Sequence, residues 1–499
     1  MQTVAATRDI LPTRLLDLAP ISHGDFIRLE SSRSLPLDTI YVTLSHCWGG
    51  HCRLTLTEDN LLGFRASILP RTFQDAVLVT RKLGVRYLWI DSLYIIQNSI
   101  QDWRHEASIM GDIYANSYVT IAATTSSDSE EGLFHSRSPL SVWPCKLEAT
   151  WDCFTAGRLA AGVTGWAEER HMELLGDRGW AFQEWLLPKR IIHFSKDQIR
   201  WGCFCLAASE AYLAGLDEAG LEYHGTPTKS IIAFIMDEAE PEILWQRIRE
   251  EYSEKRLTVA TDRLAAFSGI ARMIHKVLKC TKEDYLAGLW RPNLLEELLW
   301  DAKGSRNSQS SPYIAPTWSW ASLDGPFSGP LYHRDLPRKF HAKVLDAKTF
   351  PRDDDFGPIK GGFLTIQCPI YRVVLISLPN ASSRDNNYSW MVSSINNTSF
   401  TYRCNIGLDN AMTLAPSTRW SFYLMPIQST DFKNSGTQMT GLLIEKTTVG
   451  YGQYYRSGLL VIAGVDKEVI LSPPSEIACL DPTCYKDLSE TGLYTIELV

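Results

Sequence analysis

The sequence predicts an N-terminal α/β domain with a mainly parallel sheet, followed by a helical region and a β-rich C-terminal domain. Between residues 39 and 206, apolar runs typical of strands alternate with capped amphipathic helices, which favours a parallel sheet with helices on its faces. After Pro316, short β-branched and aromatic runs are separated by Pro, Gly, Asn and Ser, which indicates an antiparallel sandwich or a barrel-like fold. We therefore divide the chain into an N-terminal extension (1–38), the α/β domain (39–206), the helical region (207–325) and the β-rich domain (326–499).

The first predicted strand is Thr39–Leu44, and it runs into a Ser-His-Cys-Trp-Gly-Gly loop. A helix follows, because Thr72 and Asp75 have the spacing of a capping box and Gly84 provides a C-terminal stop. The second strand is Val85–Ile90, and it ends at an Asp-Ser pair.

A second capping box, Ser99 with Asp102, opens a helix that runs to about Ala115. The third strand is Tyr118–Ala123, and the polar segment Ser126–Pro139 after it is expected to be a surface loop. In open parallel sheets the ligand crevice lies at the carboxyl ends of the strands. The polar residues that directly follow the first two strands are therefore the first candidates for a site.

The rest of the chain is predicted from shorter signals. Residues Arg178–Trp201 contain a short amphipathic helix, a break at Pro188 and a strand at Arg190–Phe194. From Glu238 to about Leu299 the pattern is helical, with Trp245, Ile248, Tyr252, Leu264, Phe267, Ile270 and Ala271 at core spacing. The β-rich prediction rests on the runs Phe363–Gln367, Tyr371–Ile376, Gly441–Ile444 and Gly458–Val465.

Composition excludes several classes of function. The 499 residues carry 49 Lys and Arg against 57 Asp and Glu, a net charge of −8, which argues against nucleic-acid binding. No apolar run approaches the roughly 20 residues that span a bilayer. The 11 Cys are odd in number and scattered, which is typical of reduced thiols, so we expect a cytoplasmic protein. Zinc-finger spacing, a Walker loop and Gly-x-Gly-x-x-Gly are all missing from the sequence.

Glu106 is predicted to point inward from its helix. At 100° per residue it falls on the same face as Met110 and Ile113, and burial there would raise its pKa and make it a candidate acid, base or cation stabiliser. The alternative is a structural bridge to a buried Arg, to His46 or to His105. Asp102 lies at the edge of this face, and its capping role accounts for it.

The loop that follows the first predicted strand contains candidate ligand contacts. His46 could hold a phosphate or a ribose hydroxyl while Gly49 and Gly50 let the backbone approach, or it is a satisfied loop histidine. A dyad of His46 with Cys47 is disfavoured, because adjacent residues of an extended strand point to opposite faces.

Asp91 is either a turn cap or a ligand contact. Arg178 stands in a polar set with Gln183 and Glu184, and it either recognises an anion or forms a buried bridge to Asp91 or Glu106.

Three blocks resemble those of the fungal heterokaryon-incompatibility (HET) domain in order and spacing. They are YVTLSHCWGG (Tyr41–Gly50), LWIDSLYIIQNSIQDWRHEASIMGDIYANSYVTIAAT (Leu88–Thr124) and RGWAFQEWLLPKRIIHF (Arg178–Phe194). Residues Tyr252–Ala271, Tyr285–Trp290 and Ala315–Gly325 resemble the region that commonly follows this domain, so the resemblance covers residues 39–325. Tyr94 stands where the family usually has Cys and Asn98 where it usually has Asp, so no role is carried over to these two positions.

The resemblance implies a role in nonself recognition between fungal strains and in the cell death that follows. It also implies an αβα sandwich of the flavodoxin-like or TIR-like kind, since the HET domain is thought to be distantly similar to the TIR fold. Some TIR domains cleave NAD with a glutamate on a helix. By this analogy between folds, Glu106 is the candidate glutamate through its position and face.

The first hypothesis is therefore an NAD glycohydrolase-like hydrolase. The catalytic candidates are Glu106, Asp102 and His46, and the ligand-binding candidates are Ser45, Trp48, Gly49, Asp91, Ser92 and Arg178. Glu106 would stabilise the developing oxocarbenium ion and help a water to attack, and Trp48 would stack on a ring. NAD would be a substrate, and no metal or other cofactor is expected.

Two alternatives come from other classes of function. The HET domain could be a signalling module without catalysis that assembles with itself or with a protein partner recognised by the β-rich domain. It could also be an enzyme of a biosynthetic pathway that acts on a small molecule. Retained toxicity of Glu106→Gln would indicate the signalling module, and tight binding of an apolar metabolite without NAD turnover would indicate the biosynthetic enzyme.

Overall fold

The computed structural model divides the chain into two compact units, each of which is considered by itself. The first holds the described residues up to Trp245 together with Lys255–Leu257 and Ala265–Leu278, and the second holds Gln246–Glu254, Thr258–Leu264 and the described residues from Lys279 onward. The structure describes residues 10–18, 26–50, 54–61, 63–138, 145–151, 154–161, 174–215, 241–303, 312–330, 336–378, 389–395, 398–409, 419–432, 436–465 and 480–499.

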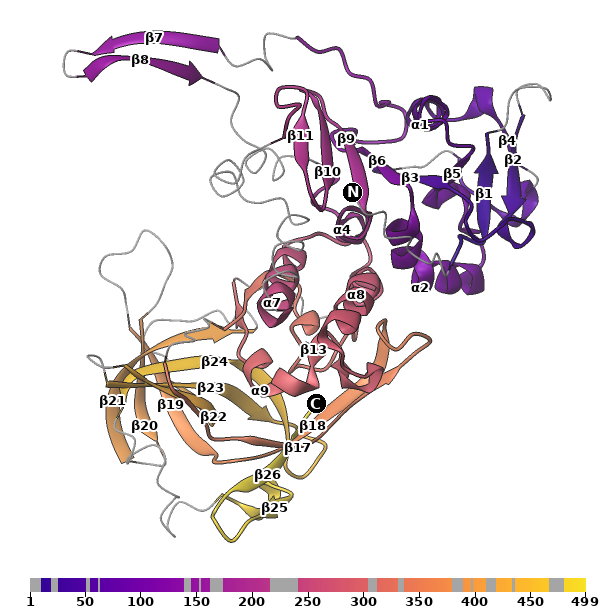
Figure 1. Cartoon of the computed structure of the whole chain (residues 1–499). Coiled ribbons are helices and arrows are strands. Elements are labelled where there is room, and N and C mark those ends of the chain that lie inside the picture. The colour runs from indigo at the N-terminus through magenta and orange to yellow at the C-terminus, as the bar shows by residue number, and fades with distance from the viewer. Residues whose placement is uncertain are drawn as a thin grey trace. The chain divides into compact units, whose positions relative to one another are not determined.

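The first unit is built on a nine-stranded sheet with the order β11-β10-β9-β6-β3-β5-β1-β2-β4 (Figure 1). The strands are β1 (Arg14–Asp17), β2 (Phe26–Ser31), β3 (Tyr41–Ser45), β4 (Gly63–Arg65), β5 (Tyr87–Ile90), β6 (Val119–Ala123), β9 (Arg190–Phe194), β10 (Ile199–Cys203) and β11 (Ala207–Ser209). A separate hairpin pairs β7 (Cys145–Trp151) with β8 (Phe154–Ala161).

The sheet is mixed, and the expected parallel arrangement is confined to its centre. Neighbours among β9, β6, β3 and β5 are parallel, whereas every pairing outside these strands is antiparallel. The links from β9 to β10 and from β10 to β11 are too short for the crossover that parallel strands need. On the other side, β1 and β2 come from the segment predicted as an N-terminal extension, and β1 pairs with β5.

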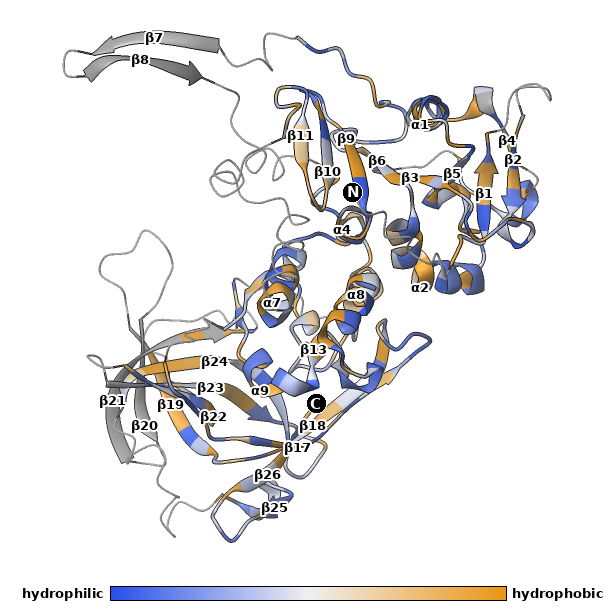
Figure 2. Cartoon of the chain, viewed as in Figure 1, coloured by the Kyte–Doolittle hydropathy of each residue, from blue (hydrophilic) through white to orange (hydrophobic). Residues whose placement is uncertain are grey.

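The strands predicted at residues 39–44, 85–90, 118–123 and 190–194 are confirmed as β3, β5, β6 and β9, and the helices between them are confirmed as well. These helices are α1 (Arg71–Lys82), α2 (Ile100–Asn116) and α4 (Gly179–Leu186). Figure 1 shows α1 on one face of the sheet and α2 on the other. Helix α8 (Ser268–Leu278) packs against α2 and α4, and Figure 2 shows hydrophobic and hydrophilic residues mixed along it, as expected for a helix with one buried side.

The predicted capping box at Thr72 is wrong, because α1 begins at Arg71 after Pro70. Thr72 Oγ1 instead accepts a hydrogen bond from Gly132 N at 3.1 Å, and Asp75 Oδ2 accepts one from Leu133 N at 2.8 Å. These bonds fix the loop after β6 against α1. That loop is therefore partly buried rather than a plain surface loop, and Leu133 is 2% exposed. At Ser99 only half of the predicted capping box is found. The Ser99 hydroxyl accepts a hydrogen bond from Asp102 N at 3.4 Å, whereas the Asp102 carboxylate binds Arg14 and Ile96 N.

The prediction of helices for residues 238–299 is confirmed at α7 (Pro241–Ser253), α8 and the short α9 (Leu294–Glu297). It is wrong for the segment between α8 and α9, and residues 238–240 lie outside the described residues. All seven residues placed at core spacing in the predicted helices are buried. Residues Tyr285–Leu286 (β12) and Leu289–Trp290 (β13) form a hairpin instead. Ala287 and Gly288 between them have φ values of 51° and 92°, as a tight turn between two strands requires.

The second unit contains a closed β-barrel. Strand β19 (Tyr371–Leu378) pairs with β20 (Ser389–Ile395) and β22 (Arg419–Phe432), and β21 (Thr398–Leu408), β24 (Gln453–Val465) and β23 (Gly436–Lys446) complete the ring with antiparallel pairings throughout. Alternate residues such as Val373, Leu424 and Leu460 form its apolar interior. The β-rich prediction is thus confirmed, and of the two expected forms the barrel is found.

Further strands extend this sheet beyond the ring. They are β16 (Arg338–Phe340), β17 (Lys343–Pro351), β18 (Ile359–Cys368), β25 (Asp487–Leu488) and β26 (Tyr494–Leu498), and a two-stranded sheet pairs β14 (Asp301–Ala302) with β15 (Phe327–Ser328). Among the helices that the structure describes, none has both the length and the apolar composition needed to cross a bilayer.

The crossing of α2 with α8 predicts a strong effect of one methyl group. A Cβ on Gly111 would lie 2.5 Å from Gly269 Cα and 3.4 Å from Gln183 Oε1, so the two helix backbones would have to separate. We expect Gly111→Ala to lower the free energy of unfolding of this unit by about 2 kcal/mol, measured by urea denaturation. In Gly50→Ala the Cβ would meet no described atom within 4 Å, so this control should stay close to the parent. Equal stability of the two variants would contradict this packing.

Candidate functional site

A group of polar side chains lies where β3 and β5 end. Ser45 is the last residue of β3, and Asp91 directly follows β5 at the start of a single 3₁₀ turn, Asp91–Leu93. The four parallel strands lie side by side in the order β5, β3, β6, β9, whereas along the chain β3 comes first and β5 second. The chain therefore adds β5 on one side of β3 and then β6 and β9 on the other side, so the connections change direction between β3 and β6. Ligand crevices in open α/β sheets lie at such a reversal, outside the carboxyl ends of the strands.

Asp91 connects the two strand ends. Its Oδ2 accepts a hydrogen bond from Trp48 Nε1 at 2.7 Å, and its Oδ1 accepts one from Ser92 N at 2.8 Å and lies 3.6 Å from His46 Nδ1. Asp91 is the first residue of this turn, and the turn has no side-chain cap, so the capping role considered for Asp91 is not found. Asp91 instead joins His46, Trp48 and Ser92, which the sequence placed among the site candidates.

His46 is held as a neutral imidazole. It is 2% exposed, and its ring lies edge-on to Phe73 with the ring centroids 4.9 Å apart. Burial lowers the pKa of His46 to about 4, although the Asp91 carboxylate opposes the shift. Among the described residues, neither ring nitrogen has a hydrogen-bond partner. A buried, neutral histidine in this state keeps both a donor and an acceptor available.

Glu184 is the residue of this group that sequence reasoning did not select. Its carboxylate, on α4, accepts a hydrogen bond from Ser45 Oγ and is 95% buried. Burial raises the pKa of Glu184 to about 7, and the nearby Asp91 carboxylate adds to the shift. A carboxyl group whose pKa lies near neutrality is suited to general acid or base chemistry. The available signal was its place in the polar set with Arg178, but Trp180, Phe182 and Trp185 around it indicated only a helix face.

Arg178 stands at the start of α4 and ties it to the loop after β3. Its Nη1 donates to the carbonyl oxygen of His46 at 2.6 Å, so the bond goes to the backbone rather than to Asp91 or Glu106, the two carboxylates expected as partners. Its positive charge acts on the Glu184 carboxyl and opposes the rise of that pKa. Cys47 is buried, and burial raises the pKa of its thiol, as expected for an inert cysteine.

Gly49 is required by the loop itself. Its φ of 72° favours glycine, and a Cβ at this position would lie 2.6 Å from Asp128 Cβ. The backbone of the loop after β3 is thus approached closely by the loop after β6, which is the segment anchored to α1. This contact orders the end of β3 on which Ser45, His46 and Trp48 stand.

Glu106 and Asp102 belong to a second polar group on α2. The inward direction predicted for Glu106 is confirmed, because it is 1% exposed. Its Oε1 lies 3.9 Å from Arg14 Nη1. Burial raises the pKa of Glu106, while the neighbouring Thr13 side chain and the charge of Arg14 oppose the shift. Within the described part of the chain, no group makes a hydrogen bond of good geometry to either oxygen of this carboxylate. Of the partners considered for Glu106, which were a buried arginine, His46 and His105, the structure shows an arginine, Arg14.

Asp102 is bound more completely than Glu106. Arg14 donates to both of its oxygens, and Ile96 N donates to Oδ2 at 2.8 Å. Although burial alone would raise it, these hydrogen bonds hold the pKa of Asp102 below its ordinary value. Asp102 therefore fixes the position of the Arg14 guanidinium, which also lies close to the Glu106 carboxylate. Arg14 lies on β1, outside the motif segments, and no local pattern pointed to it.

The two polar groups are distinct in their contacts. His46 faces Asp91, whereas Glu106 and Asp102 face Arg14. Between the first turns of α2 and α4, Trp103 packs edge-to-face on Trp180 with the ring centroids 6.2 Å apart, and both rings are partly exposed. Within the described residues, no three His, Cys, Asp or Glu side chains converge in a way that could hold a metal ion.

Comparison with known proteins identifies the segment that carries these groups. Residues 41–184 match the family model described as heterokaryon incompatibility protein (HET), which confirms the resemblance over these residues. The rest of the third block and the segments between residues 252 and 325 lie outside the match. The matched segment begins with β3 and ends at Glu184, so it contains both polar groups except Arg14. Neither a curated protein nor a solved structure gives a significant match to the chain.

The raised pKa of Glu184 predicts a pH-dependent stability. Its pKa rises from 4.5 in the unfolded chain to about 7 when folded, so the folded state binds the extra proton between these values and is favoured at low pH. This contribution is complete below pH 4.5 and is lost as the pH rises through 7. We expect the free energy of unfolding of the parent, relative to Glu184→Gln, to fall by up to about 3 kcal/mol from pH 4.5 to 8 in urea denaturation.

The exposed Glu130 supplies the control for this measurement. The stability difference between the parent and Glu130→Gln should be constant over the same range. His46 titrates in both the parent and the Glu184→Gln variant, so its contribution cancels in the difference between their free energies of unfolding. A flat difference for Glu184→Gln would mean that this carboxyl is not held in the protonated form.

Proposed function

We propose that the first unit is a flavodoxin-like or TIR-like nucleotide-binding domain that hydrolyses the nicotinamide–ribose bond of NAD, and that the chain acts in heterokaryon incompatibility and the associated cell death. The HET match supports the biological setting. The strand order second-first-third-fourth of the parallel centre supports the fold, because it is the order of the flavodoxin-like class.

The observation that carries the chemistry is the state of Glu106. A buried carboxylate that has only the Thr13 side chain and one arginine beside it, and no hydrogen bond of good geometry, is incompletely satisfied in the free protein. Positive charge that develops on the ribose during cleavage would supply the missing partner. Glu106 would then be stabilised more in the transition state than in the free enzyme, which is the condition for catalysis.

The residues around Asp91 supply the binding side of this proposal. Ser45, Ser92 and the neutral His46 offer hydrogen bonds to ribose hydroxyls, and Arg178 with the Gly49 loop offers positive charge and close backbone approach for phosphate. Trp48 is partly exposed while its ring nitrogen is held by Asp91, so its face is oriented for stacking on a base or on nicotinamide.

Asp102 and Glu184 have supporting roles in this scheme. Asp102 holds Arg14 by two hydrogen bonds and so fixes the charge next to Glu106. Glu184, with a pKa near 7, takes up or releases the proton of the ribose hydroxyl bound at Ser45. Glu106 is thus proposed as the group next to the breaking bond, and Glu184 as the proton carrier on the binding side.

The proposal is tested by incubating the purified chain with NAD and following free nicotinamide by chromatography. Removal of the Glu106 charge is expected to lower turnover at least about 100-fold, because the charge that stabilises the oxocarbenium ion is lost. Glu106→Gln keeps the size of the side chain and should retain the melting temperature of the parent. Glu130→Gln, at an exposed position, serves as the matched control and should turn over NAD as the parent does.

Each other outcome has a defined meaning. Turnover that survives in Glu106→Gln would contradict the role given to this residue. No nicotinamide release by the parent, either dilute or at crowding concentrations, would contradict the glycohydrolase and favour a signalling module or an enzyme with another small substrate.

A further inference from the structure

The barrel of the second unit carries a pocket of about 370 Å³ at one of its ends. The lining comes from the ends of β21, β22, β23 and β24 and from one residue outside the barrel, and it consists of Thr317, Leu408, Phe422, Glu445, Tyr455, Arg456 and Ser457. Phe422 belongs to the apolar interior and Leu408 packs against it, so the pocket borders the interior of the barrel. Barrel mouths are common positions of small-molecule sites, and this volume lies in their usual range.

One charge of the pocket is already neutralised. The Arg456 side chain is fully buried, its Nη1 donates to Asp409 at 2.7 Å and its Nη2 donates to the carbonyl of Trp300 at 2.5 Å. The guanidinium is stacked on the Trp300 ring, with its Cζ 3.1 Å from the ring centroid. Burial lowers the pKa of Arg456 to about 10, against the pull of Asp409 and Asp301. Arg456 therefore lines the pocket in a fixed position, and Asp409 neutralises its positive charge.

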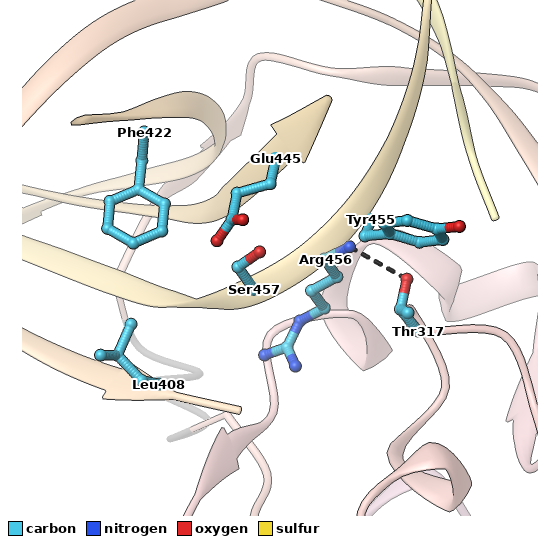
Figure 3. A pocket seen from close by; sticks show the side chains of 7 residues that line it. All are labelled: Thr317, Leu408, Phe422, Glu445, Tyr455, Arg456 and Ser457. Carbon is cyan, nitrogen blue, oxygen red and sulfur yellow. Dashed lines mark hydrogen bonds between the residues drawn. The ribbon is translucent and has the colours of Figure 1, made fainter. Parts of the chain in front are cut away.

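The remaining charge is that of Glu445. Figure 3 shows its carboxylate pointing into the same hollow as Ser457, Phe422 and Leu408, while Tyr455 points away from them. Asp409 balances Arg456, and the charge of Lys303 acts on the nearby Asp301 carboxylate, so Glu445 makes the local charge negative. An apolar wall with a carboxylate at its mouth disfavours anions and matches a cation with an apolar body.

We propose that this pocket binds a small organic ammonium ion with an apolar, preferably aromatic, body. The ammonium group donates to the Glu445 carboxylate and the Ser457 hydroxyl, and the body contacts Phe422 and Leu408 inside the barrel. The face of the Phe422 ring adds attraction for the positive charge. This site lies in the second unit and does not depend on the chemistry proposed for the first.

The test compares three probes of similar size on the full chain by ligand-observed fluorine NMR. They are 4-fluorophenethylamine, 2-(4-fluorophenyl)ethanol and 3-(4-fluorophenyl)propionate, which differ in the charge at one end. The amine should bind about fivefold more tightly than the alcohol, as expected for one partly exposed ion pair, and the propionate should bind most weakly. Glu445→Gln should remove the preference for the amine and leave the affinity for the alcohol unchanged.

Two further variants complete the test. Glu490→Gln removes an exposed carboxylate elsewhere in the same unit and should keep the preference for the amine. Ser457→Trp fills the pocket and should abolish binding of all three probes at an unchanged melting temperature, and if it fails to fold, Glu445→Gln decides alone. The proposal is overturned if no probe binds, if amine and alcohol bind equally to the parent, if the propionate binds best, or if the preference survives in Glu445→Gln.

Discussion

The hydrogen bond from Ser45 to Glu184 holds the polar centre of the first unit together. It joins the last residue of β3 to α4, two elements that are 139 residues apart in sequence. With α4 in this position, Arg178 reaches the carbonyl of His46 and Trp180 packs on Trp103 of α2. The end of β3 and the start of α4 are therefore held together by polar contacts, and the first turn of α2 joins α4 through an aromatic contact.

This arrangement moves the pKa values of several ionisable groups away from those that they have in water. The pKa of His46 is lowered because its burial outweighs the attraction of Asp91. The pKa of Glu184 is raised to about 7 because burial and Asp91 act in the same direction, so this carboxyl is only partly ionised at neutral pH. Burial raises the pKa of Glu106 against the opposing effects of the Thr13 side chain and the charge of Arg14. Such groups reduce the stability that the fold would otherwise have, and perturbed groups of this kind concentrate at functional sites.

Local patterns predicted what local interactions determine. The apolar runs gave the positions of β3, β5, β6 and β9, and helical periodicity placed Glu106 on the buried face of α2. The contribution of β1 and β2 to the sheet was not predictable, because it depends on pairing between distant segments of the chain. Arg14 lies on β1, so it could not be identified as the partner of Glu106 from the sequence either. For the same reason Thr72 and Asp75 were assigned as a cap, although they bind the loop after β6.

The central claim is that the carboxyl ends of β3 and β5 and the start of α2 form one nucleotide site. Hydrogen–deuterium exchange of the whole chain, with and without carba-NAD, tests it most directly, because this analogue cannot be cleaved at the nicotinamide–ribose position. We expect slower exchange in residues 45–50, 91–96 and 100–106 when the analogue is present. Unchanged exchange in all three segments at a saturating concentration would contradict the claim, and so would protection confined to the barrel.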